Sequence, residues 1–242
     1  KVKTNKILDN QKAEIESLLL NILPTEVAKE LQSSGKATPR SYERVSVMFS
    51  DFRGFTTIAD KMSPEELVQE LNSSFMVFDQ ISEKYKLEKI KTIGDAYMCA
   101  GGIPIPDEHH VYNMVRASLE MQEYIVSNNR KREEEGKPVW DLRVGIHVGP
   151  VVAGVVGRRK YAYDIWGSTV NIASRMESNG APGRVNISSA TYELIKDRFV
   201  CTHRGKIHAK NVGEIDMYFV DYELDETNKV PSLPKAEEVK VG

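Results

Sequence analysis

The sequence has few cysteines, and it lacks both a long apolar run and an excess of charge of either sign. Two cysteines among 242 residues, Cys99 and Cys201, are too few for a disulfide framework and predict reduced thiols in a cytoplasmic domain. Apolar runs of only a few residues exclude a transmembrane helix within this sequence, although a longer protein that contains it could be membrane-attached. The 33 basic and 35 acidic residues give a net charge of −2, which argues against a nucleic-acid-binding surface.

Two common nucleotide-binding motifs are also missing. No segment matches the P-loop pattern G-x-x-x-x-G-K-[ST] or the dinucleotide-binding pattern G-x-G-x-x-G. Gly149, Gly154 and Gly157 lie close together, but without the P-loop lysine they are interpreted as turn and bulge glycines. The five histidines and two cysteines show no zinc-ligand spacing. A phosphate site in this chain would therefore need another geometry.

The N-terminal segment predicts a helix unlike the rest of the chain. Leu8, Ile15 and Ile22 recur every seven residues. This imperfect heptad pattern favours the end of a parallel coiled coil over an amphipathic helix packed on its own domain. Pro24 ends this helix, and residues 24–32 predict one more short helix. Because the chain does not begin with methionine, we expect a fragment whose coiled coil continues from an upstream module.

The rest of the chain alternates strand and helix patterns as one domain. The predicted elements are a strand at 45–49, a helix from 63, strands at 87–93 and 96–100, a helix at 109–128, strands at 142–148 and 151–156 around a Gly149-Pro150 turn, a helix at 168–178 and a small unit over 185–222, with a solvated charged linker at 130–138. The order β-α-β-β-α-β predicts an α+β fold with a ferredoxin-like core, an antiparallel sheet covered by helices on one face. The expected division is an N-terminal helix and linker, one domain, and a flexible polar tail: residues 1–41, 42–222 and 223–242.

Two aspartates fall where strands end. Asp51 directly follows the first predicted strand, and Asp95 lies in the turn between the next two strands. We expect the first and third elements of the β-α-β-β order to lie side by side, which would bring both carboxylates to one edge of the sheet. Paired carboxylates suit Mg²⁺ or Mn²⁺, which take phosphate oxygens and waters as further ligands. Backbone N–H groups around Gly54, Phe55 and Thr56, beside a helix start, predict a phosphate site next to them.

Two further motifs accompany these aspartate segments. The segments 49–56, 91–98, 143–147 and 166–176 have the sequences FSDFRGFT, KTIGDAYM, RVGIH and WGSTVNIASRM. In this order and spacing they resemble the catalytic domain of class III adenylyl and guanylyl cyclases, over roughly residues 42–222. The resemblance implies the class III cyclase fold and an activity that converts a nucleoside triphosphate to a cyclic nucleotide and pyrophosphate.

The resemblance also implies roles for the residues of the first three motifs. Asp51 and Asp95 match the family's ligands for two divalent cations, and the backbone carbonyl of Phe52 matches a further ligand. Arg143 matches an arginine that contacts the polyphosphate. These four positions would form the metal and phosphate half of the site.

The second half of the site would recognise the base and stabilise the transition state. Asn171 and Arg175 match the family's transition-state residues, and Lys210 matches a phosphate-binding lysine, although the usual Lys-Gly-Lys-Gly is here Lys-Asn-Val-Gly. Lys91 and Asp164 occupy the base-recognition positions, where guanylyl cyclases carry Glu and Cys. An ammonium donor and a carboxylate acceptor complement N1 and the 6-amino group of adenine, and a mismatched buried polar pair costs about 1–3 kcal/mol. The resemblance therefore implies an adenylate cyclase that binds ATP.

In the family, the two halves of one site come from different chains. The resemblance thus implies a head-to-tail homodimer with two equivalent sites, in which the N-terminal coiled coil relays a signal from an upstream sensor. A guanylate cyclase and a catalytically inactive nucleotide-sensing domain are the alternative hypotheses. The G-G-D-E-F motif of diguanylate cyclases is missing from the sequence.

Overall fold

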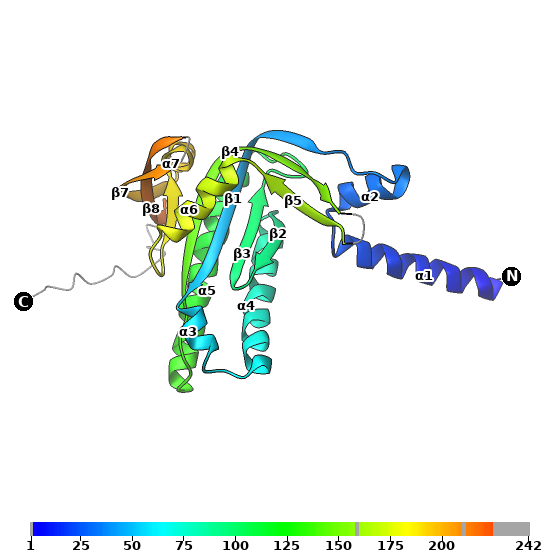
Figure 1. Ribbon diagram of the computed structural model, residues 1–242, viewed down its shortest axis with the longest axis horizontal. Helices are drawn as coiled ribbons and strands as arrows, with labels where there is room; N and C mark the ends of the chain where they lie inside the picture. The colour runs from blue at the N-terminus through cyan, green and yellow to red at the C-terminus, as the bar shows by residue number, and fades with distance from the viewer. Residues whose placement is uncertain (1, 158–159, 210–211, 225–242) are drawn as a thin grey trace, which may run out of the picture.

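A computed structural model of the chain describes residues 2–157, 160–209 and 212–224. Its main element is an eight-stranded sheet of order β2-β3-β1-β4-β6-β8-β7, with β5 paired to β4 (Figure 1). The strands are β1 Arg40–Arg53, β2 Glu88–Ile93, β3 Ala96–Gly101, β4 Asp141–Val156, β5 Ala162–Trp166, β6 Val185–Ser188, β7 Phe199–Ala209 and β8 Gly213–Glu223. The helices are α1 Val2–Leu20, α2 Thr25–Ser34, α3 Phe55–Ala59, α4 Pro64–Lys84, α5 His110–Glu134, α6 Ser168–Ser178 and α7 Ser189–Ile195.

The predicted ferredoxin-like core is confirmed as β1-α4-β2-β3-α5-β4, with the strands in the order β2-β3-β1-β4. Three details of the prediction are wrong. The neighbour of β1 is β3, the fourth element of the β-α-β-β order, because β3 returns from the hairpin towards the centre of the sheet. The sheet is not wholly antiparallel, since β4 pairs with β6 in parallel. Helices also lie on both faces, because α6 packs on β4 and β1.

Alternate residues of β1 point to opposite faces of the sheet and contact different helices. Met48 packs in one core cluster with Phe78 of α4 and Met114 of α5, and Val47 packs in another with Ala173 of α6. The start of α4 is fixed as its sequence predicts, because the Ser63 side chain caps the helix and Glu66 closes a capping box. The sheet is thereby held between α4 and α5 on one side and α6 on the other.

The predicted turn at Gly149-Pro150 is wrong, since β4 runs through it without a break. The reason is the pairing with β1, which continues on both sides of the proline: Val45 lies opposite Gly149, and Tyr42 lies opposite Val151. The register shifts between these pairs, and a bulge accommodates a proline, which has no N–H to donate. The long β4 strand then carries β5 away from the body of the sheet, as the projecting ribbon in Figure 1 shows.

The charged segment 130–138 is not simply a solvated linker, because α5 continues to Glu134. Arg132 is only 4% exposed. Its guanidinium pairs with Glu70 of α4, lies 4.8 Å from the Trp140 ring centroid and donates to the Pro138 carbonyl. These contacts replace the hydrogen bonds to water that an exposed arginine would make. The segment therefore fixes the end of α5 against α4 and against the chain that leads into β4.

The N-terminal helix α1 projects away from the sheet (Figure 1). Leu8 and Ile15 are each 66% exposed, so the heptad stripe is not packed on its own domain. The chain returns to the body at Leu23 and Ala28, which are buried in the same cluster as Val47. The first helix ends at Leu20, four residues before the proline predicted to end it, and Pro24 is instead the N-cap of α2. No helix among the described residues is both long enough and apolar enough to cross a bilayer.

We expect Glu88→Gln to stabilise the domain at pH 8 and to have little effect near pH 4.5. Glu88 lies opposite Ala100 in the sheet, and its charge acts on the buried Tyr163. Burial raises the pKa of Glu88 to about 7 from 4.5. The folded state therefore holds a proton that the unfolded state releases, and wild-type stability falls as pH rises from 4.5 to about 7. The shift corresponds to at most about 3 kcal/mol. Thermal unfolding of both proteins across pH measures this, and a gain that does not change with pH would contradict it.

Candidate active site

Three predicted residues meet at the end of the sheet where β1 finishes. Asp51 lies opposite Arg143 in the β1–β4 ladder, and the Arg143 guanidinium donates to the Asp51 carboxylate with an Nη2–Oδ2 distance of 3.1 Å. The β2–β3 turn brings Asp95 to the same end, where its carboxylate accepts from the Phe52 N–H and lies within hydrogen-bonding reach of Asp51. The Phe52 side chain is buried in the core. The predicted carboxylate pair is therefore formed, and it lies beside a guanidinium.

The charges at this end suit a divalent cation. Burial, and then the neighbouring Asp51 carboxylate, raise the pKa of Asp95 to about 6. Two oxygen ligands so close together repel one another unless a cation neutralises them. Among the residues that the structure describes, no cluster of three or more His, Cys, Asp or Glu side chains forms a more complete metal site. The pair therefore fits Mg²⁺ or Mn²⁺, which complete their coordination with backbone carbonyls, water and phosphate oxygens.

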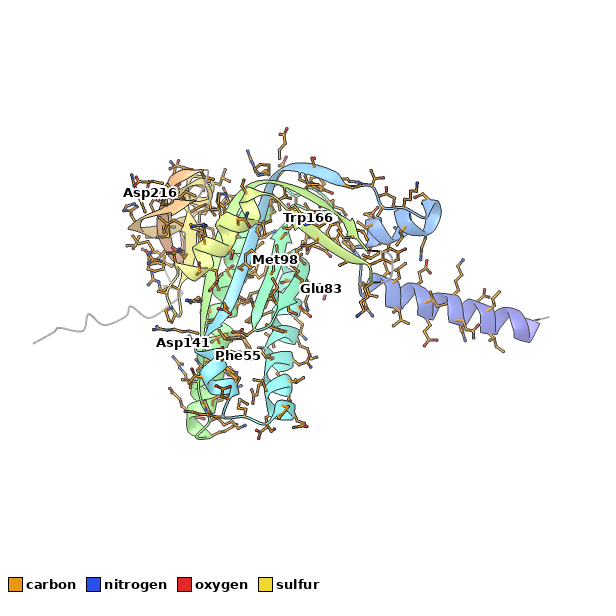
Figure 2. All side chains as sticks on the ribbon, in the orientation of Figure 1. Phe55, Glu83, Met98, Asp141, Trp166 and Asp216 are labelled. Atoms are coloured by element: carbon orange, nitrogen blue, oxygen red, sulfur yellow. The ribbon has the colours of Figure 1, made fainter. Side chains whose placement is uncertain are left out.

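The loop after β1 turns directly into a short helix. Gly54 has φ of +72°, a conformation that glycine adopts readily, and it forms the N-cap of α3. The first N–H groups of a helix have no acceptor within it, and here they belong to residues that follow Gly54, including Phe55 and Thr56. The Phe55 ring stacks on Trp140 at a centroid distance of 5.8 Å. Figure 2 shows Phe55 near Asp141 at this end of the sheet, so the loop is anchored beside the carboxylates.

A further acidic residue, Glu177 of α6, completes this group and was missed by the sequence analysis. Its Oε1 lies 2.9 Å from Arg143 Nη2. Burial raises its pKa to about 7 against the opposing effect of Arg143, and Asp51 and Asp95 add to the increase. A sequence signal was available, because Glu177 follows Ala173 by four residues and therefore lies on the apolar face of α6.

The two residues predicted to recognise the base meet between β2 and β5, since Lys91 lies on β2 and Asp164 on β5. Lys91 Nζ donates to Asp164 Oδ2 at 2.6 Å, and Asp164 Oδ1 accepts from the Ile165 N–H. Asp164 lies on β5, an element that the sequence analysis did not assign. The two residues predicted to face the base are therefore in contact with one another, although they are 73 positions apart in the chain.

Asn171 and Arg175 lie one turn apart on an exposed face of α6. Arg175 donates to the His208 carbonyl of β7 at 3.1 Å. This contact holds the guanidinium towards the β7–β8 hairpin. Lys210, predicted in that hairpin, lies outside the described residues. The candidate residues thus form three groups within one chain: the carboxylates with Arg143, the Lys91–Asp164 pair, and the exposed face of α6.

A comparison with known proteins identifies the domain. The sequence profile of the adenylate and guanylate cyclase catalytic domain matches residues 37–222. This chain belongs to that family. An adenylate cyclase of Mycobacterium tuberculosis is 38% identical over 206 residues, which are 85% of this chain and 46% of the relative. The rat guanylate cyclase soluble subunit beta-2 is 38% identical over 228 residues, which are 93% of this chain and 33% of the relative.

Solved cyclase structures confirm the fold. The crystal structure of the adenylyl cyclase CyaB from P. aeruginosa has a TM-score of 0.71 at 30% identity, covering 76% of this chain and 95% of that one. The chain spans less than half the length of the two curated relatives named above. The adenylate cyclase and the guanylate cyclase subunit named above are both 38% identical to the chain, so these likenesses do not decide between the two activities.

Proposed function

We propose that this cyclase domain is an adenylate cyclase, which converts ATP to 3′,5′-cyclic AMP and pyrophosphate. The observation that carries the proposal is the contact of 2.6 Å between Lys91 and Asp164. The pair presents one donor and one acceptor side by side, which is the complement of adenine N1 and the 6-amino group. Guanine offers O6 as acceptor and N1–H as donor, so it would place a donor against Lys91 or an acceptor against Asp164. Unpaired polar groups of this kind give strong discrimination.

The reaction needs the metal half and the base half at one nucleotide. We place them in a head-to-tail homodimer, where Asp51, Asp95 and Arg143 of one chain face Lys91 and the other second-half residues of its partner: Asp164, Asn171, Arg175 and Lys210. Exposed apolar side chains support this surface as an interface. Ile93, two residues after Lys91, is 55% exposed, and Trp166, two residues after Asp164, is 42% exposed.

The chemistry follows from the charges at the site. The ribose 3′-oxygen attacks the α-phosphorus in line, and pyrophosphate leaves. Two cations held by Asp51, Asp95 and the Phe52 carbonyl would supply Lewis-acid activation and charge neutralisation. Arg143 and the N–H groups after Gly54 would hold the polyphosphate.

The partner's α6 provides the remaining groups. Arg175 would neutralise charge that develops on the α-phosphoryl oxygens, and Asn171 would orient the ribose. We assign no side chain as the base that accepts the 3′-hydroxyl proton.

The N-terminal region supports a signalling role. We propose that residues 1–41 carry the coiled-coil transducer in α1 and a linker whose α2 packs on the domain, and that residues 42–222 form the catalytic domain. β8 extends to Glu223, and the rest of the predicted tail, from residue 225 onwards, lies outside the described residues. The unpacked stripe of α1 is the surface that a second copy of α1 would cover, and an upstream sensor would act through it. Two unpaired thiols, Cys99 and Cys201, and an ATP substrate fit a cytoplasmic location.

We expect the purified chain with Mn²⁺ to turn over ATP at least about tenfold faster than GTP, as one mismatched polar contact requires. Because each site is shared, the rate per chain should rise with protein concentration until the dimer is saturated. Cyclic nucleotide production from each substrate, measured across protein concentrations, tests both points. A preference for GTP would identify a guanylate cyclase, and ATP binding without turnover would identify a nucleotide-sensing domain.

A further inference from the structure

Glu177 is a buried carboxylate of the candidate active site. The proposed function assigns it no role. Its side chain is 11% exposed, and its Oε1 lies 2.9 Å from Arg143 Nη2. The same nitrogen lies 3.1 Å from Asp51 Oδ2. One nitrogen of the guanidinium thus lies between a carboxylate of the metal group and a carboxylate of α6.

The approach of Glu177 to the sheet is built into the fold. A Cβ on Gly145, two residues after Arg143, would lie 1.9 Å from the Glu177 backbone nitrogen. Only glycine at that position lets α6 come so close. The Asn186 side chain of β6, the register partner of Gly145, donates to the Met176 carbonyl at 2.8 Å and holds the same turn of α6 against the sheet. The Glu177–Arg143 contact therefore rests on two backbone constraints.

We propose that Glu177 is the positioning residue that keeps Arg143 aimed at the substrate polyphosphate. This inference depends on the proposed cyclase function. A carboxylate that ligates cations is a weaker partner for a guanidinium, so Asp51 loosens its hold on Arg143 when the site is loaded. Glu177 is not among the proposed ligands and retains its contact. It fixes the arginine at Nη2 and, since Nε is buried, leaves Nη1 as the nitrogen available for phosphate oxygens.

The role proposed for Glu177 can be tested separately from that of Arg175, because the two residues serve different halves of the site. Arg175, two residues earlier on α6, serves the partner's half-site under the proposed function, whereas Glu177 reaches Arg143 of its own chain. A residue that merely stabilised α6 would affect Asn171 and Arg175. A residue that positions Arg143 affects the metal and phosphate half.

The first test is the isosteric change Glu177→Gln, with Glu193→Gln on α7 as the matched control, since Glu193 forms an exposed pair with Lys196. We expect the KM for metal–ATP to rise at least about tenfold with a smaller fall in kcat, because polyphosphate binding is lost in the ground state as well. Calorimetric titration of Glu177→Gln with tripolyphosphate in the presence of Mn²⁺ should show a loss of tripolyphosphate affinity of the same size, and this measurement involves no turnover. In an Arg143→Ala background, Glu177→Gln should add less than twofold.

The second test uses mixed dimers to assign the half-site. Glu177→Gln chains should recover activity when mixed with Arg175→Ala chains, which leaves one site free of both changes. They should not recover when mixed with Asp51→Ala chains. The opposite pattern, or a KM within twofold of wild type, would overturn the positioning role. An inactive wild-type chain would refute the proposed function and not the role of Glu177. The tripolyphosphate titration needs no activity, so unchanged tripolyphosphate binding in Glu177→Gln would contradict the positioning role even then.

Discussion

We expect chains carrying Asp51→Ala and chains carrying Arg175→Ala, each nearly inactive alone, to recover cyclase activity when they are mixed. Asp51→Ala removes half of the carboxylate pair, and Arg175→Ala removes the cation proposed for the α-phosphoryl oxygens. Each change should lower turnover by about 10³-fold or more. In a mixed dimer, one site receives both changes and the other neither. Random exchange therefore restores about a quarter of the wild-type rate, because about half of the dimers are mixed and each has one intact site.

A matched mixture tests whether this recovery comes from shared sites. Asp51 and Asp95 belong to the same half of the site and contact one another. Chains with Asp51→Ala and chains with Asp95→Ala therefore leave no intact site in any pairing. Activity that returns in this second mixture, or fails to return in the first, would contradict the assignment of halves. Both mixtures need only a fixed total protein concentration and a cyclic AMP assay.

Local geometry was enough to place Asp51 and Asp95 at strand ends and to bring them to one end of the sheet, although the strand expected beside β1 was β2 and the structure has β3 there. The contact between Lys91 and Asp164 could not be predicted from local geometry, since β5 depends on pairing with the far end of β4. The resemblance to cyclases gave both residues a role at the base but did not predict that they touch. Glu177 was missed because an acidic residue near the end of a helix usually faces water, and its burial depends on the glycine at position 145.

The fold predictions failed where tertiary contacts overrode local pattern. Pro150 was expected to end a strand, but β1 pairs on both sides of it and the bulge removes the need for its N–H. Arg132 was expected in solvent because its neighbours are charged. Glu70 lies 62 positions away in the sequence and Trp140 just beyond the charged segment, and together they supply the partners that let Arg132 be buried. Neither partner can be read from the segment that contains the arginine.

We expect Gly145→Ala to destabilise the domain by more than about 3 kcal/mol and to remove its cyclase activity, because overpacking against backbone cannot be relieved by a rotamer change. The added methyl carbon would lie 1.9 Å from the Glu177 nitrogen and 2.4 Å from the Met176 carbonyl carbon. To avoid this overlap, α6 has to move away from β4. The same movement separates Glu177 from Arg143 and displaces Arg175. Thermal unfolding should show a fall in Tm of roughly 10 °C or more.

Gly154→Ala is the control in the same strand. Its nearest neighbour would be Pro39 Cβ at 3.5 Å, an ordinary contact, and its backbone is not in the left-handed region. Replacing glycine by alanine at such a position stabilises by about 0.4–1 kcal/mol, mainly through the unfolded state. The two changes therefore have opposite signs although both add one methyl group to β4. Equal Tm shifts would show that α6 does not depend on close approach at Gly145, and Arg143 would then lack the constraint that we propose for it.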